Sequence, residues 1–316
     1  MKNFTSADDV EDPLALVKEA IELKKNPTAY AHLGKNKTAG LLFLNPSLRT
    51  RLSSQKAAQL LGMNVMVMNM DKEGWALEWN DGVVMNGSKT EHIKDAAMVL
   101  STYFDIIGIR CFPTLTDKDA DYSEHVLKQL IKYSTVPVLS LESATLHPLQ
   151  SLADSITIFE KLNKKIKPKI VLSWAPHVKA LPQSVSNSFA QWMRALKVDI
   201  TITHPEGYEL AHEFTNGLVI EHDQQKALKD ADFVYVKNWS AYNSYGQIPA
   251  VKDDWLLSEK KMQITNNAYI MHCLPVRRNV ELPDKLLDGP RSLVPLQAQN
   301  RLYSAAIVMK KILETL

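Results

Sequence analysis

The chain of 316 residues is long for a single hydrophobic core, so its length predicts two domains. Hydrophobic residues make up 45% and charged residues 23%, which is the composition of an ordinary globular protein. The 37 basic and 35 acidic residues leave a net charge of +2. This balance gives no electrostatic case for nucleic acid or a membrane as a partner.

The sequence carries no mark of secretion or of a disulfide scaffold. Its N-terminal stretch, MKNFTSADDVEDP, is polar and acidic and lacks the apolar core of a signal peptide. The longest apolar runs are too short to span a bilayer. Cys111 and Cys273 are the only cysteines, with no CxxC and no metal-ligand spacing. We therefore expect a cytoplasmic protein that binds neither a metal nor a membrane.

Short runs that favour strands alternate with helical stretches along the chain. Expected strands are 41–45, 65–69, 106–110 and 136–139, followed by 169–173, 199–203, 232–236 and 268–272. Expected helices are 91–102, 122–133, 149–162, 183–195 and 300–316. This alternation predicts an α/β fold of two doubly wound parallel-sheet domains joined by helices.

The charged run NKKIKPK at 163–169 interrupts this pattern, and a new strand starts directly after it. We expect a first domain over 1–150 and a second over 151–299. The final stretch, 300–316, has apolar residues at helical spacing on one face, so we expect it to return and pack on the first domain.

The stretch at 41–51, LLFLNPSLRTR, joins an expected buried strand to a helix that ends near Gly62. Ser47 is a good N-cap residue for that helix. Free backbone N–H groups and the positive end of the helix dipole lie at such a junction. Its hydroxyl and guanidinium groups add donors that suit a phosphate dianion. A capped helix with solvated arginines is the alternative.

Other polar residues follow expected strands, where ligands of doubly wound sheets bind. Arg110 ends an apolar run, and His147-Pro-Leu-Gln150 begins a helix with proline near its first position. Cys273, in His272-Cys-Leu-Pro275, would be a nucleophile only with an acid–base partner, which the sequence does not place. A buried structural thiol is therefore favoured at this position.

Together these motifs resemble the carbamoyltransferase (transcarbamylase) family over essentially the whole chain. The marks of that family are Ser-x-Arg-Thr-Arg, His-Pro-x-Gln and His-Cys-Leu-Pro, which stand here at 47–51, 147–150 and 272–275. Gln299-Asn-Arg301 is a further family-like signature, with glutamine in place of the usual acidic residue. The resemblance is strongest to the branch that acts on N-acylated ornithine.

The resemblance implies two sets of substrate-binding residues. Those implied for carbamoyl phosphate are Ser47, Leu48, Arg49, Thr50, Arg110, His147, Gln150, Cys273, Leu274 and Arg301. Those implied to act in catalysis are Arg49, Thr50, Arg110, His147, Gln150 and Cys273. Those implied for acylornithine are Trp75, Thr90, Glu142, His177, Asn187, Lys237, Leu274, Arg277 and Arg278.

The implied reaction is attack by the neutral δ-amine of an acylated ornithine on the carbamoyl carbon, as a step of arginine biosynthesis. It requires no metal, nucleotide or other cofactor. In the family, Trp75 and the loop after it are implied to reach a neighbouring subunit's site. The resemblance therefore implies a homotrimer with shared active sites.

The residue before Glu91-His92 is associated with the choice of acyl group in this family. Enzymes for N-acetylornithine have glutamate there and those for N-succinylornithine have proline, whereas this chain has Thr90. A glutamate would repel the succinyl carboxylate, and threonine removes that repulsion. Glu281 also replaces a lysine associated with the acetyl branch. We expect N-succinyl-L-ornithine as acceptor, with N-acetyl-L-ornithine as the alternative.

Three other functions stay open from the sequence. One is transfer to free ornithine. A second is a non-catalytic regulator that binds a metabolite, although such a protein would be expected to lose Arg49, Arg110, His147 or Gln150, and all four are present. The third is a nucleotide-dependent oxidoreductase, which the absence of GxGxxG after any expected strand disfavours.

Overall fold

The computed structural model describes residues 1–70, 72–162, 168–252 and 254–316, and its chain divides into two compact units. The first unit comprises Met1–Thr114, Lys118–Leu149 and Arg301–Leu316, and the second comprises Leu115–Asp117 and Gln150–Asn300. Helices α6 (Pro148–Lys161) and α12 (Val294–Leu313) each cross a boundary between these ranges. Positions 163–167 of the charged run lie outside the described residues.

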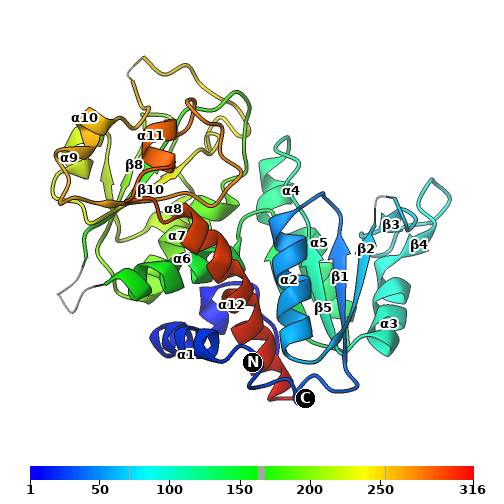
Figure 1. Ribbon diagram of the computed structural model, residues 1–316. Coiled ribbons are helices and arrows are strands. Elements are labelled where there is room, and N and C mark those ends of the chain that lie inside the picture. Colours follow the sequence, from blue (N-terminus) through cyan, green and yellow to red (C-terminus); the bar gives the residue numbers. More distant parts are fainter. Residues whose placement is uncertain (71, 163–167, 253) are drawn as a thin grey trace. The chain divides into compact units, whose positions relative to one another are not determined.

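The first unit is built on a four-stranded parallel sheet in the order β2-β1-β5-β6 (Figure 1). Its strands are β1 (Thr38–Phe43), β2 (Asn64–Asn69), β5 (Ile106–Arg110) and β6 (Val138–Glu142). Phe43 is paired in register with Arg110, so β1 and β5 end at the same level. The loop after β1 and the arginine that ends β5 therefore lie at one edge of the sheet.

Helices α2 (Arg49–Leu60), α3 (Ile93–Tyr103), α4 (Lys118–Tyr122) and α5 (His125–Tyr133) belong to the same unit. Leu42 and Ile107, from neighbouring strands, pack in one cluster with Ile93 of α3 and Leu127 of α5. Because side chains alternate along a strand, one face of the sheet is buried under these two helices. Burial of this face holds the strand ends in place.

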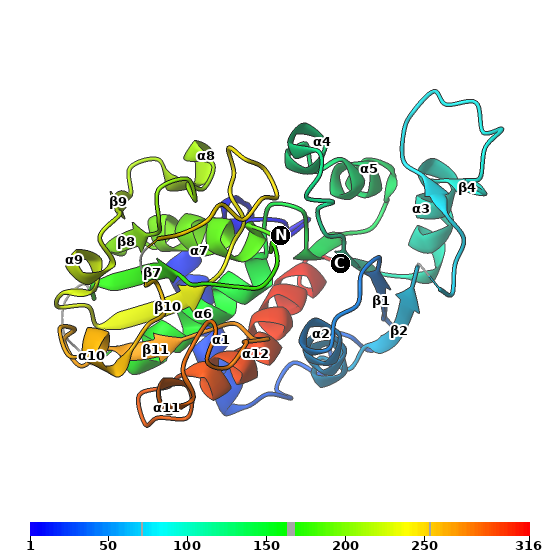
Figure 2. The same cartoon turned by 90° about the horizontal axis from the view of Figure 1, so that it is seen from above.

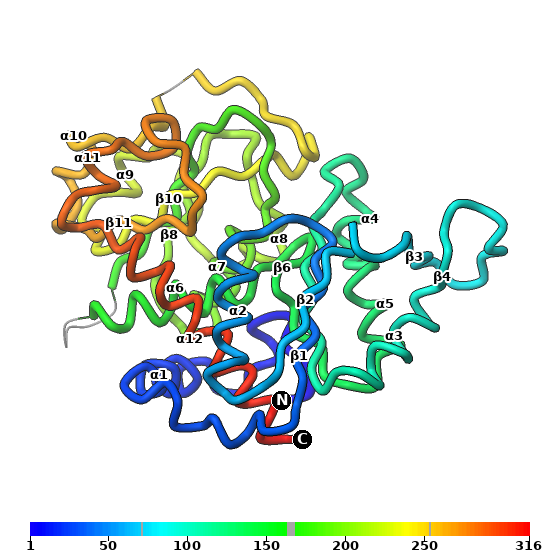
Figure 3. The backbone as a smooth tube through the Cα atoms, turned by 45° about the vertical axis from the view of Figure 1, so that its right-hand side comes forward, coloured from blue at the N-terminus to red at the C-terminus, as the bar shows by residue number. Residues whose placement is uncertain are grey.

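The N-terminal part of the first unit was not predicted. Helix α1 (Pro13–Lys25) follows the short helix η1 (Ala7–Asp9). Asp12 caps α1 by accepting a hydrogen bond from the Ala15 N–H at 2.9 Å, and Pro13 occupies its first turn. Both are start signals that the sequence displays. The chain ends meet in this unit, where the Thr315 hydroxyl donates to the Met1 carbonyl at 3.4 Å (Figure 3).

Two expected helices of the first unit have different bounds in the structure. Glu91–His92 forms strand β4, which pairs with β3 (Leu77–Glu78), and α3 begins only at Ile93. The expected helix at 122–133 is divided between α4 and α5 because Glu124 adopts a left-handed conformation with φ 53°. The Glu124 carboxylate accepts a hydrogen bond from the Thr145 N–H at 2.7 Å, which holds the break in place.

The second unit contains a five-stranded parallel sheet in the order β11-β10-β7-β8-β9 (Figure 2). Its strands are β7 (Ile170–Trp174), β8 (Ile200–Thr203), β9 (Val219–Glu221), β10 (Phe233–Lys237) and β11 (Tyr269–Met271). Its helices include α7 (Ser184–Ala195), α8 (His212–Thr215), α9 (Gln224–Leu228), α10 (Glu259–Met262) and α11 (Asp284–Leu287). The short edge strand β9 is mostly exposed and was not predicted.

The predicted fold of two parallel α/β sheets is confirmed. The predicted Ser47 cap is wrong, because Leu48 already has helical dihedral angles and occupies the N-cap position without a side-chain hydrogen bond. Helix α12 begins at Val294 rather than at residue 300, and Pro295 in its first turn was the missed start signal. None of the described helices is long and apolar enough to cross a membrane.

Candidate active site

A buried cluster of polar side chains in the first unit is centred on Thr50, in the first turn of α2. Its hydroxyl accepts hydrogen bonds from Arg301 Nη2 at 2.9 Å and from Arg110 Nη1 at 3.3 Å. All three side chains are largely withdrawn from solvent. The structure thus brings together three predicted site residues from distant parts of the chain. Two guanidinium groups beside a helix N-terminus favour an anionic ligand.

Glu142 belongs to the same cluster. Arg110 Nη1 donates to Glu142 Oε2 at 2.5 Å, and His147 Nε2 lies 3.3 Å from the same oxygen. The residue was predicted to bind acylornithine, and the structure places it at the end of β6 in contact with two residues predicted for carbamoyl phosphate. Its negative charge offsets part of the positive charge of the cluster.

His147 is held neutral by its surroundings. Burial lowers the pKa of His147 well below its usual 6.5, and the positive charges of Arg301, Arg110 and Arg49 lower it further. Because Nε2 faces a carboxylate oxygen, the single proton of the neutral ring belongs on Nε2. The residue can therefore donate one hydrogen bond without carrying a charge.

This environment predicts the titration of His147. We expect its ring resonances in an NMR titration to stay unchanged from about pH 8 to about pH 6, because the imidazolium is strongly disfavoured. His147→Gln assigns the signal. Since its folded pKa lies below the unfolded value, the stability His147 contributes is complete above about pH 6.5 and declines below it. A midpoint near 6.5 for His147 would contradict this description of the site.

The predicted phosphate loop precedes α2. Ser47 and Arg49 are half-buried, whereas the Leu48 side chain is 67% exposed. The exposed leucine side chain fits the expectation that only its backbone N–H serves a ligand. Asn45, which was not predicted as a site residue, fixes the neighbouring backbone by accepting from the Phe112 N–H at 2.7 Å.

Trp75 and Thr90 lie at the same end of the β3–β4 pair. The Trp75 indole N–H donates to Glu91 Oε2 at 2.7 Å, and the Thr90 N–H donates to the Ala76 carbonyl at 3.0 Å. Both residues are exposed, and Trp75 retains 57% of its accessible surface. The pairing of β3 with β4 thus explains how positions far apart in the sequence become neighbours.

In the second unit, His177 and Arg277 are in direct contact. Arg277 Nε donates to His177 Nε2 at 3.2 Å. His177 Nδ1 lies against the backbone of Lys179, 2.8 Å from its carbonyl oxygen and 3.2 Å from its nitrogen. Arg278 instead binds Asp284 and Asp288 at 2.7 Å each. Arg278 is thus held by two carboxylates, whereas the guanidinium of Arg277 contacts a neutral histidine ring.

The other acylornithine residues of this unit lie at the sheet and on α7. Lys237 ends β10 and donates from Nζ to the Asn238 carbonyl at 2.7 Å, and Asn187 is fully buried on α7. Burial opposes ionisation of Glu281, but His272 and Lys237 outweigh it and hold its pKa below the usual value. Glu281, which stands where the family resemblance suggested lysine for the acetyl branch, is thus favoured as an anion.

Gln150, Cys273 and Leu274 also belong to the second unit. Gln150 is buried in the first turn of α6, as predicted from the proline before it. Leu274 has a positive φ of 55°, and its N–H donates to His272 Nδ1 at 2.9 Å. Cys273 is partly exposed as a residue where the chain leaves β11, and the burial of its thiol stays a prediction.

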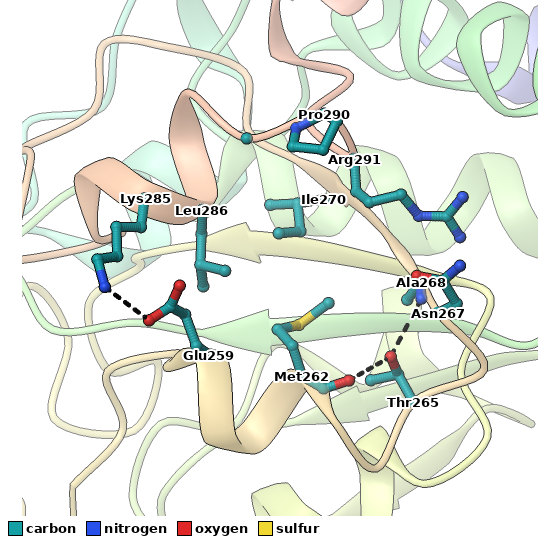
Figure 4. A pocket seen from close by; sticks show the side chains of 11 residues that line it. Glu259, Met262, Thr265, Asn267, Ala268, Ile270, Lys285, Leu286, Pro290 and Arg291 are labelled. Atoms are coloured by element: carbon teal, nitrogen blue, oxygen red, sulfur yellow. Dashed lines mark hydrogen bonds and ion pairs between the residues drawn. The ribbon is translucent and has the colours of Figure 1, made fainter.

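A pocket of about 220 Å³ lies elsewhere in the second unit, between α10 and α11 (Figure 4). Its lining includes Glu259 and Lys285, whose charged groups are 3.2 Å apart. None of the site residues predicted from the sequence lines it. In the described part of the chain, no group of His, Cys, Asp or Glu side chains is arranged to hold a metal ion.

Two residues beside the predicted site were missed. Asp154 accepts hydrogen bonds from Gln150 and from Gln297. The spacing of four residues between Gln150 and Asp154 on one helix was a usable signal. Gln297 was missed because its helix was predicted to begin three residues after it.

Comparisons with known proteins extend over the whole chain. The profile described as "Aspartate/ornithine carbamoyltransferase, carbamoyl-P binding domain" matches residues 2–160, and that described as "Aspartate/ornithine carbamoyltransferase, Asp/Orn binding domain" matches 181–312. An N-succinylornithine carbamoyltransferase of Bacteroides thetaiotaomicron strain VPI-5482 is 50% identical, with both chains fully covered. An N-acetylornithine carbamoyltransferase of Xanthomonas axonopodis pv. citri is 35% identical, covering 93% of this chain and 91% of that protein.

A solved structure is also similar over nearly the whole chain. It is a glutamate-to-alanine variant of N-acetyl-L-ornithine transcarbamylase complexed with carbamyl phosphate and N-succinyl-L-norvaline. It superposes with a TM-score of 0.90 at 32% identity, covering 99% of this chain and all of that chain. These matches show that the chain belongs to the aspartate/ornithine carbamoyltransferase family.

Proposed function

We propose that this chain transfers the carbamoyl group of carbamoyl phosphate to the δ-amine of N-succinyl-L-ornithine, giving N-succinyl-L-citrulline and phosphate. The observation that carries the proposal is the buried cluster in which Arg110 and Arg301 converge on Thr50. Its positive charge suits a dianionic substrate. The identity of 50% to an N-succinylornithine carbamoyltransferase over both full lengths supports the choice of reaction.

In this proposal the first unit binds the phosphate and the carbonyl oxygen of carbamoyl phosphate. Ser47, Arg49 and Thr50, with the Leu48 N–H, hold the phosphate at the start of α2. Arg110 bridges the phosphate and the carbonyl oxygen. The Nε2 proton of neutral His147, which faces Glu142 in the free protein, turns to that oxygen when the substrate is bound. Negative charge grows on the oxygen as the amine attacks, so these preorganised donors stabilise the transition state more than the ground state.

The carbamoyl NH₂ group needs acceptors rather than donors. We assign this role to the Gln150 side-chain oxygen and to the carbonyl oxygens of Cys273 and Leu274, with Arg301 beside the same group. The left-handed conformation of Leu274 supports this assignment, because it turns the local backbone away from the regular strand direction. Cys273 then contributes its carbonyl rather than its thiol.

The chemical step moves one group and one proton. The lone pair of the δ-amine forms the new C–N bond. The bond between the carbamoyl carbon and the oxygen that bridges to phosphorus breaks, and phosphate leaves with the electron pair of that bond. The departing phosphate is basic enough to take the proton of the amine. No protein base is then required, and the protein acts by orientation and by stabilising charge.

For the acceptor, we propose that the second unit binds the α-carboxylate. His177, Lys237 and Arg277 supply donors, and the buried amide of Asn187 adds a polar contact. Arg278 contributes less because Asp284 and Asp288 already hold its guanidinium. Glu142, which faces Arg110 and His147, lies beside the carbamoyl site and is suited to face the attacking amine.

Thr90 supports succinyl as the acyl group. A threonine places no negative charge next to the second carboxylate of a succinyl group, whereas a glutamate would. The solved complex in which a glutamate variant of N-acetyl-L-ornithine transcarbamylase holds N-succinyl-L-norvaline is in line with this argument. The exposure of Trp75 and Thr90 supports the further proposal that this loop reaches the active site of a neighbouring subunit. The protein would then be a cytoplasmic homotrimer, and its mass in solution tests this oligomeric state.

The Thr90 argument makes a prediction about specificity. Thr90→Glu is expected to lower kcat/KM for N-succinylornithine by about 100-fold, because two carboxylates about 4–5 Å apart repel by a few kcal/mol. The value for N-acetylornithine should change much less. Ser88→Glu, which adds the same charge two residues earlier in the exposed loop, is the matched control. Equal losses for both acceptors in Thr90→Glu would contradict a charge-based role.

The proposed activity is tested by following phosphate release and citrulline-derivative formation with carbamoyl phosphate as donor. A transferase forms both products in equal amounts, and only when an acceptor is present. A metabolite-binding regulator would bind a carbamoyl phosphate analogue without turnover. That outcome, in a folded protein, would overturn the proposal.

A further inference from the structure

A fully buried carboxylate lies directly behind one of the proposed substrate-binding groups. Asp154 is one helical turn after Gln150 on α6, so both side chains project from the same side of the helix. Gln150 Nε2 donates to Asp154 Oδ1 at 2.7 Å, and both residues are almost completely withdrawn from solvent. The reaction as proposed above assigns no role to Asp154.

The contact fixes the orientation of the Gln150 amide. An ionised carboxylate only accepts hydrogen bonds, so the group that faces Asp154 has to be the amide nitrogen. The amide oxygen of Gln150 then points away from Asp154. An exposed amide can rotate so as to present either its oxygen or its nitrogen. The Gln150 amide is held with its nitrogen toward Asp154 and its oxygen on the opposite side. An amide oxygen in this position accepts a hydrogen bond from an NH₂ group but forms none with a methyl group.

The same carboxylate oxygen holds a second amide. Gln297 Nε2 donates to Asp154 Oδ1 at 2.7 Å, and the Gln297 oxygen accepts from the His272 N–H at 3.0 Å. The ring of His272 in turn accepts from the Leu274 N–H at 2.9 Å. Asp154 therefore also fixes the Gln297 amide, whose oxygen faces the His272 N–H just before the loop carrying Cys273 and Leu274.

Tyr235 is a further buried neighbour of Asp154. Burial raises the pKa of the Tyr235 hydroxyl well above its usual value, and the negative charge of Asp154 raises it further. The hydroxyl thus remains a neutral donor beside the carboxylate. Burying a carboxylate costs free energy. That cost is understandable where the carboxylate fixes the orientation of neighbouring amide groups.

We propose that Asp154 is a positioning residue that makes Gln150 present its oxygen to the substrate, so that the site selects the carbamoyl NH₂ group over a methyl group. The inference rests on the proposed function, since it assumes that Gln150 faces carbamoyl phosphate. Asp154 acts through Gln150 and touches no reacting atom.

The test compares carbamoyl phosphate with acetyl phosphate, which has the same shape and phosphate but a methyl group in place of NH₂. Dissociation constants for both ligands are measured on the full-length protein and on Asp154→Asn. An asparagine keeps the size but can also donate, so the Gln150 amide is no longer held in one orientation. We expect the preference for carbamoyl phosphate to fall about tenfold, which corresponds to one hydrogen bond, while acetyl phosphate binding stays within about twofold.

Ser155→Ala is the matched control, because Ser155 is equally buried on the same helix and its hydroxyl donates to the Ser151 carbonyl of that helix at 2.8 Å. Its ligand preference should equal that of the wild type. An unchanged preference in Asp154→Asn, or an equal loss for both ligands, would overturn the positioning role and leave the proposed function standing. Failure of the wild type to bind or turn over carbamoyl phosphate would overturn both.

A second measurement does not depend on the folding of a variant. Neutron diffraction from deuterated wild-type crystals locates the amide deuterons of Gln150 directly. The proposal requires both to be on the nitrogen that faces Asp154. Deuterons on the side turned away from Asp154, or a protonated Asp154 that donates to Gln150, would overturn it.

Discussion

Replacing Arg110 by methionine is expected to lower kcat/KM for carbamoyl transfer by about 10³. Loss of one preorganised donor costs roughly 10²–10³ in rate. The change also removes the arginine that holds the buried Glu142 carboxylate at 2.5 Å beside the phosphate site. Both effects oppose binding of a dianion and stabilisation of the developing oxyanion, so steady-state kinetics should show a loss in kcat as well as in affinity.

Two further variants separate these contributions. Arg51→Met removes a guanidinium from the same helix turn, but Arg51 bonds to Asn69 and stacks on the Phe43 ring at 4.8 Å. Its loss should cost less than about tenfold in rate. Adding Glu142→Gln to Arg110→Met should recover stability by removing the buried charge, but it should not recover activity. An active Arg110→Met enzyme would show that Arg110 does not touch the substrate.

Replacing Gly62 by alanine is expected to destabilise the first unit by roughly 3 kcal/mol or more. Gly62 follows α2 with a φ of 81°, which costs an alanine about 1–2 kcal/mol. An added Cβ would also lie 2.0 Å from the Ala31 carbonyl oxygen, so the backbone itself would have to move. Since α2 carries the proposed phosphate site at its other end, activity should fall with stability.

Gly82→Ala is the matched control for this prediction. Gly82 has a similar φ of 73°, but an added Cβ would meet nothing within 4 Å. Denaturant unfolding of the two variants therefore isolates the clash from the cost of the backbone conformation. Equal losses of unfolding free energy would mean that the loop containing Ala31 adjusts freely and that its close approach to Gly62 is unimportant.

The strands and their chemistry were predictable where the signal is local. The apolar runs ending at Arg110 and the proline before Gln150 predicted the end of β5 and the start of α6. These features depend on a few consecutive residues, whose burial and backbone preferences act together. The same holds for the α/β alternation that predicted two parallel sheets.

Features that depend on distant partners were not accessible from the sequence pattern. Glu142 is paired with Arg110 across two neighbouring strands, and no periodicity indicates which carboxylate will meet which arginine. The left-handed Glu124 that divides α4 from α5 is stabilised by Thr145, in a later loop. The contact between Thr50 and Arg301 joins positions near opposite ends of the chain, and only the family resemblance pointed to it.

The most direct test of the proposed reaction is a competition among three acceptors in one mixture. N-succinylornithine, N-acetylornithine and ornithine are supplied at equal concentrations with carbamoyl phosphate, and the three citrulline products are separated by mass. The structure and the relatives predict N-succinylcitrulline as the main product, because Thr90 places no charge against the succinyl carboxylate. Predominant N-acetylcitrulline would contradict the proposed acceptor, and the absence of all three products from a folded protein would contradict carbamoyl transfer itself.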